Sequence, residues 1–544
     1  MNDGDVERKA QDEKSREEEM ERKEKEWATR KPVEYPKVTI SAFTETGREE
    51  SSIVVPLQRI YTGREPVIPS ILAGTPCATL GARGLLDHLN STLGTSYGLD
   101  DPFLTSILVE CMTNECDLGM AYGRLRRIWY IDDWSRARDV LWRWCGEDQK
   151  ERREALVGNR IVKPYLPPRR LQPISHSWMD EKDRTAVWTP INGYKWPVPI
   201  PKDADLNLIR IEMLNLGEEY VWLDVLCLRQ EGGRREDLHA EEWRLDVPTI
   251  GYVNVVCYLS GLGRPLMLNE GDLDSNRCWF RRAWMLQEIG DWREIAGDTP
   301  DGPMHAECKD EKYATELLTR FHTKLQDASD LESEWLEGAL AEMRTRVSTN
   351  PVDKIAGLAF LMGSMWIPAY SESASLEHAW TALVHSMNAW FRGQFFFLCA
   401  EPGDGGPKWW PSWHQVMTKP LLPYEVLISV DRDETGGVDS CEVECVDGFM
   451  QGLAVVKEGD RQGEFIVECD DSILQFKITT PHTYPIPEDT YTLIWKESDD
   501  LDVISNVCVV GRSLPEGRFE KVSVVEAFDK DLMDITEKRQ YILI

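Results

Sequence analysis

The chain has 544 residues, of which 42% are hydrophobic, and it carries a formal net charge of −32. That length is enough for roughly three domains with cores of their own. The acidic balance argues against nucleic acid and anionic membrane surfaces as partners, because both attract basic surfaces. No stretch is apolar enough for a signal peptide or a bilayer span, so we expect a cytoplasmic protein.

The first 168 residues divide into a charged segment and a helical one. Residues 1–35 mix Glu, Lys and Arg with almost no apolar side chains. Such a segment buries too little surface to offset the entropy of ordering, which predicts a disordered tail. Residues 36–168 carry helical patterns in GARGLLDHLNSTL, DPFLTSILVECM and VLWRWCGEDQKERREAL. We expect a mostly helical region that the prolines of LPPRRLQP close.

Residues 169–310 have the pattern of an α/β domain. The short apolar runs PISHSW, YVWLDVLCL and VVCYLSGLG alternate with helical stretches, which is typical of βα units around a parallel sheet. In DADLNLIRIEMLNLG the apolar residues recur at helical spacing, with Asp203 or Asp205 as the N-cap and Gly217 as the stop. This segment should form the first crossover helix.

The rest of the chain predicts a helical region over residues 311–420 and a β-rich domain over residues 421–544. In the first, Ser329 and Glu332 have the spacing of a capping box that would start a helix. In the second, EVLISV, EFIVEC, LQFKITT, YTLIW and VCVVG are short, β-branched runs between turn residues. They predict a small antiparallel sandwich or barrel.

The 13 cysteines are an odd number and are scattered without the spacing of a zinc site. We therefore expect mostly reduced, buried thiols and no metal site. Cys441 and Cys445 lie four residues apart, which leaves a metal or disulfide role as a minor alternative.

The stretch RCWFRRAWMLQEI at residues 277–289 places a carboxylate among apolar side chains. If the stretch is helical, Trp284 and Glu288 stand four residues apart on one face. Burial beside the indole would raise the pKa of Glu288, unless Arg281 or Arg282 favours the charged form. The pattern fits either a carboxylate in a cleft or a solvated Glu on an amphipathic helix whose Trp packs inward.

Three blocks of the sequence resemble the hallmark motifs of the fungal heterokaryon-incompatibility family, the HET domain, in the family's order. The blocks are Ser175, His176 and Trp178; Trp222, Leu223, Asp224, Cys227 and Gln230; and Arg282, Ala283, Trp284, Gln287 and Glu288. DKIAGLAFL resembles a block that often follows them. The resemblance implies a role in fungal self/non-self recognition that ends in programmed cell death or growth arrest.

The same blocks also resemble a Toll/interleukin-1 receptor (TIR) domain, which implies a flavodoxin-like parallel sheet. ISHSWMDEKD is similar to that family's first strand and loop, VWLDVLCLRQEGG to its second strand and loop, and RAWMLQE to its Trp-x-x-x-Glu helix. In the TIR proteins that destroy NAD+, that Glu is the catalytic carboxylate. The resemblance therefore implies Glu288 as a catalytic residue at the carboxyl edge of the sheet, where such folds bind ligands.

Cleavage of NAD+ to nicotinamide and ADP-ribose suits these residue types. A carboxylate can stabilise the oxocarbenium-like transition state, and the neutral leaving group needs no general acid. Trp178 would stack on a base, and Arg281 or Arg282 would meet the pyrophosphate. The predicted substrate-binding set is completed by Ser175, His176, Asp224 and Trp284.

Structural roles for the same residues remain open. His176 would bond within its loop, and Asp224 would cap the turn after a buried strand. Trp222 and Trp284 would belong to the core. The connection between VPTIG and VVCYLSG is also short for the HET family, which suggests a short second crossover or a missing helix.

Two mechanisms from different classes follow. In one, the chain is an enzyme that cleaves NAD+ through Glu288. In the other, its TIR-like domain self-associates into a homo-oligomer or recruits other incompatibility proteins, and Glu288 is structural. A third hypothesis takes KWWPSW at residues 408–413, with the β-rich tail, as a carbohydrate-binding module, although no secretion signal supports it.

Overall fold

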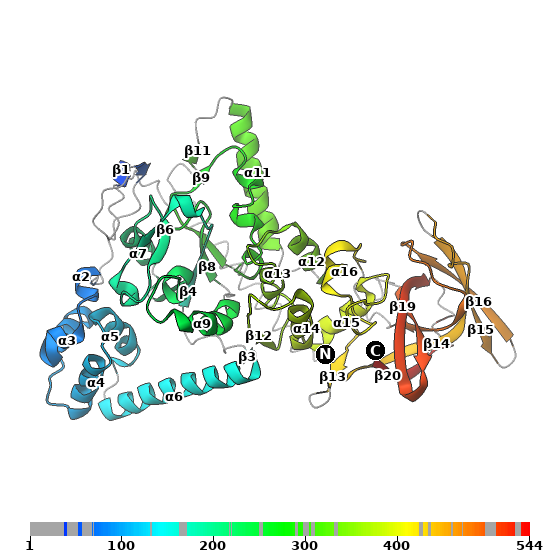
Figure 1. The fold of residues 1–544 in the computed structure, drawn as a ribbon, viewed down its shortest axis with the longest axis horizontal. Coiled ribbons are helices and arrows are strands. Elements are labelled where there is room, and N and C mark those ends of the chain that lie inside the picture. The colour runs from blue at the N-terminus through cyan, green and yellow to red at the C-terminus, as the bar shows by residue number, and fades with distance from the viewer. Residues whose placement is uncertain are drawn as a thin grey trace, which may run out of the picture.

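The structure is a computed structural model that combines a parallel four-stranded sheet, an antiparallel C-terminal sheet and two helical regions (Figure 1). The expected tail at residues 1–35 lies outside the described residues. The structure describes residues 37–40, 53–56, 68, 70–130, 133–162, 171–216, 218, 220–249, 254–288, 292–297, 304–305, 311–330, 336–423, 428–433, 437–457, 461–469, 472–495, 507–527, 532 and 535–544.

The N-terminal region is mostly helical where it is described, as its sequence predicts. It opens with an antiparallel pair of strands that the sequence did not indicate. α4 begins where its pattern does, because the Asp101 carboxylate accepts hydrogen bonds from the backbone N–H groups of Phe103 and Leu104. The elements are β1 (Lys37–Ile40), β2 (Ile53–Pro56), α2 (Ser70–Ala73), α3 (Cys77–Leu93), α4 (Pro102–Thr113) and α5 (Leu118–Leu125).

The long helix α6 (Trp134–Gly158) connects this region to the rest of the protein and is largely exposed beyond Leu141. Near its end, Arg152 donates hydrogen bonds of 2.8 and 2.9 Å to the Asp246 carboxylate of α9 (His239–Asp246). β3 (Arg160–Val162) then pairs antiparallel with β12 (Trp366–Pro368). The N-terminal region is therefore attached to both of the regions that follow it.

In the described part of the chain, four strands form the parallel sheet, in the order β10-β8-β4-β7. The central strands are β4 (Leu171–His176) and β8 (Asn254–Tyr258), and the edge strands are β7 (Tyr220–Leu223) and β10 (Trp292–Ile295). Ile174, Leu223 and Val256 bury their side chains against one another and against the first crossover helix, α7 (Leu206–Asn215).

The crossovers settle two sequence predictions. The first crossover helix is confirmed: the Asp205 carboxylate accepts a 2.7 Å hydrogen bond from the backbone N–H of Asn207, while Gly217 lies outside the described residues. An antiparallel hairpin, β5 (Arg184–Val187) and β6 (Val198–Pro201), precedes it. The second crossover contains α8 (Asp224–Cys227) and α9 ahead of VPTIG. The short connection after VPTIG thus does not leave this crossover without a helix.

The second helical region begins with α11 (Glu311–Asp330), which buries Leu317 and Phe321 against the sheet domain. Because that helix continues through Ser329, the prediction that Ser329 starts a helix is wrong. The next helices and the short elements of the sheet domain are α12 (Leu336–Thr345), α13 (Asp353–Ala356), α14 (Leu376–Ser386), α15 (Ala389–Leu398), α16 (Trp413–Thr418), α10 (Met285–Glu288), β9 (Met267–Leu268) and β11 (Met304–His305).

The tryptophans of KWWPSW belong to this region's core. Trp409, Trp410 and Trp413 are all buried there, packed with Trp380 of α14. None of the three rings is available to stack on a sugar, so the carbohydrate-binding hypothesis loses the feature on which it depended.

Within the described residues, the C-terminal sheet has eight strands, six of which pair in a closed antiparallel barrel in the order β14-β15-β16-β19-β18-β17 and back to β14. β13 pairs with the start of β14, and β20 pairs antiparallel with β14 and parallel with β19. EFIVEC, LQFKITT, YTLIW and VCVVG form strands as predicted, whereas residues 428–430, the described end of EVLISV, do not. The strands are β13 (Asp431–Arg432), β14 (Asp439–Gln451), β15 (Arg461–Cys469), β16 (Ser472–Thr480), β17 (Asp489–Trp495), β18 (Val507–Leu514), β19 (Arg518–Ala527) and β20 (Glu537–Leu543).

The barrel does not stand apart from the second helical region. Its interior is filled by aromatic and branched side chains such as Phe465, Phe476 and Tyr491. Its outer face shares a second core with the helices, where Phe519 of β19 lies 5.8 Å from Phe396 of α15. The sequence boundary at residue 420 is therefore a change of secondary structure within one packed unit.

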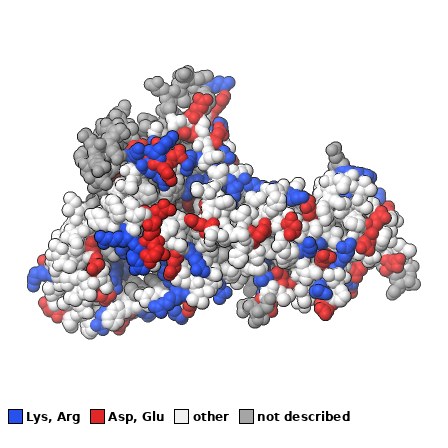
Figure 2. Space-filling view, in the orientation of Figure 1, with Lys and Arg blue, Asp and Glu red and all other residues white. Residues whose placement is uncertain are grey.

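The surface carries both signs of charge. Figure 2 shows Lys and Arg interspersed with Asp and Glu over the visible face. Among the described residues, no helix is both long and apolar enough to cross a bilayer.

Candidate functional site

The candidate residues meet at the carboxyl edge of the parallel sheet. Ser175 and His176 are the last residues of β4 and pair with Cys257 and Tyr258 at the end of β8. Asp224 follows directly after β7, the other neighbour of β4. Because parallel strands end at one edge, side chains from three distant segments become neighbours there.

His176 and Asp224 form a buried pair across two strands. The His176 Nε2 atom lies 2.8 Å from the Asp224 Oδ1 atom, which also accepts a 2.7 Å hydrogen bond from the backbone N–H of Val225. Burial alone would raise the pKa of Asp224, but His176 and Arg282 outweigh it and hold that pKa below its usual value. Asp224 is therefore an ionised group that also starts α8.

Glu288 lies beside this pair in an enclosed position. Its residue is 6% exposed, and its carboxylate accepts a hydrogen bond from the Ser175 hydroxyl. The Ser175 oxygen in turn accepts a 2.7 Å hydrogen bond from the Trp279 indole N–H. A chain of hydrogen bonds therefore runs from Trp279 through Ser175 to Glu288.

Arg282 lies close to both carboxylates of the network, Asp224 and Glu288. Its guanidinium donates to the backbone carbonyl of His176, and its Nη1 atom lies 3.8 Å from the Glu288 Oε2 atom. The same cation lowers the pKa of Asp224. Ser175, His176, Asp224, Arg282 and Glu288, which come from three separate sequence blocks, thus form one network.

A cavity of about 210 Å³ opens next to this network, between the ends of β4 and β8. Trp178 and Trp279 contribute aromatic surface to it, and its charged lining comes from Asp180, Asp183, Asp272, Arg264 and Arg277. Both of these arginines are already paired with carboxylates, Arg277 with Asp180 and Arg264 with Asp203. Glu288 does not line the cavity, but Trp279 does, and it is connected to Glu288 through the Ser175 hydroxyl.

Trp178 lies at the border between the network and the cavity. Its ring is 5.4 Å from the His176 ring, and the Arg184 guanidinium lies 5.1 Å above it. One tryptophan face is therefore occupied by a cation from β5. Gly261, in the GLGRP loop, has a φ of +111°, and a Cβ there would meet Met179 Sδ at 3.1 Å. Glycine lets that loop approach the cavity.

Two predicted residues lie apart from the network. The Arg281 guanidinium donates a 2.9 Å hydrogen bond to the Asp274 carbonyl on the surface. The Trp284 ring packs 6.0 Å from the Tyr370 ring, in a cluster with Trp222. Neither side chain belongs to the hydrogen-bonded set around Glu288.

The stretch at residues 277–289, for which the sequence allows a helix, does not form one continuous helix where it is described. A 3₁₀ turn at Trp279–Arg281 is followed by Arg282 in an extended conformation, with φ −72° and ψ 138°. Arg282 is extended because its neighbours pair with Val347: Val347 N–H donates to the Arg281 carbonyl, and Ala283 N–H donates to the Val347 carbonyl. Only the single turn of α10 is α-helical, which explains why Trp284 and Glu288 have different surroundings.

Trp279 is the functional neighbour that sequence reasoning missed. It lies in the same stretch as Glu288, but its role depends on Ser175, more than a hundred residues earlier in the chain. Gln287, one of the residues on which the resemblance to the HET family rests, binds the backbone: its amide donates to the Pro248 carbonyl at 3.0 Å.

Within the described residues, the cysteines are free thiols, most of them buried, Cys441 and Cys445 included. The same residues contain no group of His, Cys, Asp and Glu side chains placed to hold a metal ion. No family model, curated protein or solved structure matches the chain.

Proposed function

We propose that this chain is a HET-type protein of fungal self/non-self recognition, and that its α/β domain is a flavodoxin-like, TIR-like module that binds NAD+ or a related nucleotide. The observation that carries the proposal is the convergence of Ser175, His176, Asp224, Arg282 and Glu288 at one edge of the sheet. In chain order the strands lie 2-1-3-4, which is the order of flavodoxin-like sheets.

The location of the cavity supports the nucleotide part of this proposal. In open α/β sheets, ligands bind outside the carboxyl ends of the strands at the point where the strand order reverses. Here that point lies between β4 and β8, where the cavity is. Its volume of about 210 Å³ is below the roughly 300–1,000 Å³ of sites that enclose drug-sized ligands. It would therefore enclose one ring of a dinucleotide, with the remainder outside.

The ring most suited to the cavity is the nicotinamide of NAD+. That ring is cationic, and the lining offers the Asp183 carboxylate and the aromatic surfaces of Trp178 and Trp279. When the bond between the ring nitrogen and ribose C1′ breaks, its electron pair neutralises the ring. Water then adds to the oxocarbenium-like ribose and loses a proton, which yields ADP-ribose. Glu288 would stabilise the positive charge that develops on the ribose.

This role requires Glu288 to leave the position described here. Its carboxylate would have to exchange the Ser175 hydroxyl for the substrate, past the Trp279 indole. We propose that this hydrogen-bonded state is the resting state, and that nucleotide binding or self-association displaces Ser175.

The second candidate function, a non-catalytic self-association module, is favoured by the burial of Glu288. Carboxylates that are enclosed and bonded to a hydroxyl and an arginine are commonly structural. On this hypothesis the network fixes the sheet edge, and the domain acts by recruiting copies of itself or other incompatibility proteins.

Purified protein incubated with NAD+ and assayed for free nicotinamide tests the proposal, with Glu288→Gln as the decisive variant. If Glu288 is catalytic, the variant should lose about a hundredfold or more in rate. Glu242→Gln is the matched control, because Glu242 accepts two hydrogen bonds from the buried Arg229 of the same domain. It should lower the melting temperature and leave the rate unchanged.

The two candidate functions predict different results. An early-melting Glu288→Gln variant that cleaves NAD+ at the parent rate would overturn the catalytic assignment. Absence of cleavage by the parent protein, together with concentration-dependent self-association of the chain in light scattering, would favour the second function.

A further inference from the structure

A second and larger cavity lies away from the sheet edge, where three regions of the chain meet. Its volume is about 960 Å³, near the upper end of the range typical of small-molecule sites. Leu156 at the end of α6 forms one side, α9 forms another, and the segment from Val352 to Leu383 forms the floor. Small-molecule sites occur preferentially at such junctions between domains.

The floor of this cavity is apolar. It consists mainly of aliphatic side chains, among them Val352, Ile355, Ala359, Ile367, Ala382 and Leu383. Several of these residues are almost completely buried within the cores of the second helical region. The alanine side chains at the floor are small and leave space that larger side chains would fill. The apolar part of a ligand could occupy that space.

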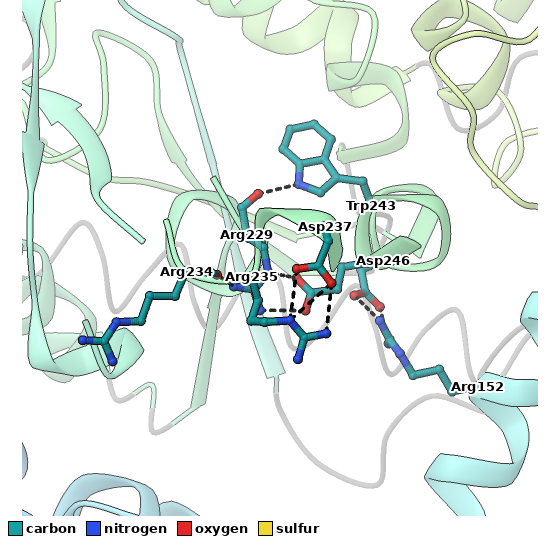
Figure 3. Close-up of polar contacts among 8 residues, drawn as sticks. Arg152, Arg229, Arg234, Arg235, Asp237, Trp243 and Asp246 are labelled. Atoms are coloured by element: carbon teal, nitrogen blue, oxygen red, sulfur yellow. Dashed lines mark hydrogen bonds and ion pairs between the residues drawn. The ribbon is translucent and has the colours of Figure 1, made fainter. Parts of the chain in front are cut away.

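The wall formed by α9 is connected to the neighbouring segments by hydrogen bonds and ion pairs, which Figure 3 draws as dashed lines. Arg229 forms two hydrogen bonds of 3.0 Å with the Glu242 carboxylate, and the Trp243 indole N–H donates to the Arg229 carbonyl at 2.7 Å. Arg152 of α6 binds Asp246 at the other end of the helix. The cavity is therefore preformed, which reduces the ordering cost of binding a ligand.

Negative charge predominates at the rim. Asp237 is neutralised by Arg235, with which it forms hydrogen bonds. In the part of the chain that the structure describes, neither Glu241 nor Glu372 forms an ion pair, and both are exposed. Arg244 is the one Lys or Arg among the described lining residues. The rim therefore has a surplus of carboxylate for a ligand cation to meet.

We propose that this junction cavity is a second ligand site, and that it takes a cationic amphiphile: a molecule with an apolar or aromatic body and an amine. The body would lie on the aliphatic floor and the amine between Glu241 and Glu372. Because α6, α9 and α14 all contribute to the cavity, such a ligand would stabilise the arrangement of the three regions by mass action.

A matched set of probes tests the charge preference. Phenylbutylamine, phenylbutanol and phenylbutyrate share one body and differ in charge, and each would be titrated into the full chain by calorimetry. The amine should bind about two- to fivefold more tightly than the alcohol, as expected for a partly exposed ion pair. The carboxylate should bind more weakly than the alcohol. A carboxylate that binds as tightly as the amine would overturn the proposal.

Variants test the location. Ala382→Trp fills the floor of the cavity and should weaken the affinity for phenylbutylamine at least about tenfold. Val157→Trp adds the same bulk at a residue that is 88% exposed and does not line the cavity. This variant should bind the amine as tightly as the parent does. Should Ala382→Trp fail to fold, the exposed pair Glu241→Gln and Glu372→Gln still decides: together they should abolish the preference for amine over alcohol. Unchanged preference in that double variant would refute the site.

Discussion

Lys521 is a lysine without access to solvent, and its replacement should stabilise the protein at neutral pH. The residue lies on β19, is 1% exposed, and donates a 2.9 Å hydrogen bond from Nζ to the Cys399 carbonyl of the second helical region. Burial lowers the pKa of Lys521 from 10.5 to about 8. Near 1.4 kcal/mol per pKa unit, keeping the buried amine charged costs about 3 kcal/mol.

The sign of the pH dependence follows from the protons bound in each state. Below about pH 8 the amine is charged in both states, so the folded protein carries the full cost. Between about pH 8 and pH 10.5 the unfolded chain keeps the proton that the folded protein has lost, and this residue makes stability rise with pH. Above pH 10.5 the cost is absent.

Lys521→Met removes the buried amine and keeps most of the side-chain volume. It also leaves the Cys399 carbonyl without this donor, which costs about 1 kcal/mol. The variant should therefore be more stable than the parent by about 2 kcal/mol at pH 7. At pH 10.5 or above, the parent should instead be more stable than the variant by about 1 kcal/mol.

Urea unfolding followed by circular dichroism, on parent and variant at both pH values, measures this difference. Most buried cysteines titrate alike in both proteins, so their contributions cancel in the comparison. Cys399 is the exception, because burial raises the pKa of its thiol and, in the parent alone, the charge of Lys521 lowers that pKa in part. Lys477→Met, at an exposed position on β16 of the same barrel, is the control and should change stability little at either pH. A Lys521→Met variant whose stability difference from the parent is the same at pH 7 and pH 10.5 would refute the reasoning.

Two further predictions concern the network at the sheet edge. Ser175→Ala strands the Trp279 indole N–H and one oxygen of Glu288 and should cost about 1–3 kcal/mol in urea unfolding. If that hydroxyl restrains a catalytic Glu288, the same variant should release nicotinamide faster than the parent, whereas a slower rate would contradict the restraint. Asp224→Asn should cost about 2 kcal/mol at pH 7, because it removes a charge bonded to His176. Since the pKa of Asp224 is lowered, the stability it provides is present above about pH 4 and lost as pH falls further. The gap between parent and variant should therefore narrow as the pH falls below about 4, and a gap of the same size at about pH 4 and about pH 2 would exclude the charge as its cause.

The fold was predictable where the signal is local. Helix starts at Asp101 and Asp205 follow from a carboxylate that caps the N–H groups just after it, which the sequence displays directly. Short β-branched runs between turn residues predicted four strands of the barrel. Two of these runs, YTLIW and VCVVG, are buried on both faces. The closure of that barrel depends on the pairing of β17 with β14, which no local pattern encodes.

Local patterns failed where a distant segment decides the conformation. The stretch around Arg282 has helical periodicity, but hydrogen bonds to Val347 hold it extended. Ser329 has the residue type of an N-cap, but the helix that buries Leu317 and Phe321 continues through it. In both cases tertiary contacts outweigh propensities of less than about 1 kcal/mol per residue.

The motif residues of the site were predictable, but the partners that control them were not. Ser175, His176 and Asp224 end adjacent strands, and strand ends can be recognised in a sequence. By contrast, the Trp279 bond to Ser175 and the Arg184 position above Trp178 arise from loops and a hairpin. The Trp279–Ser175–Glu288 hydrogen bonds hold the Glu288 carboxylate, and the proposed catalysis depends on its release.

The charge of the network affects how strongly the site would attract a cationic substrate. With His176 counted as neutral, Asp224, Glu288 and Arg282 together carry a formal charge of −1, and they lie next to a cavity whose own arginines are paired with carboxylates. On the proposed function, NAD+ would bring a cationic ring to this negative site, and cleavage would convert that ring into neutral nicotinamide. The electrostatic attraction would then favour the substrate over the product and help nicotinamide leave. The same surplus explains why Glu288 needs Arg282 and Ser175 while the cavity is empty, since a buried carboxylate without a cation or donor would be costly. Arg282 would be needed both for the proposed catalysis and for the stability of the network. Glu288→Gln separates the two roles of Glu288, because it removes the charge while it keeps the shape.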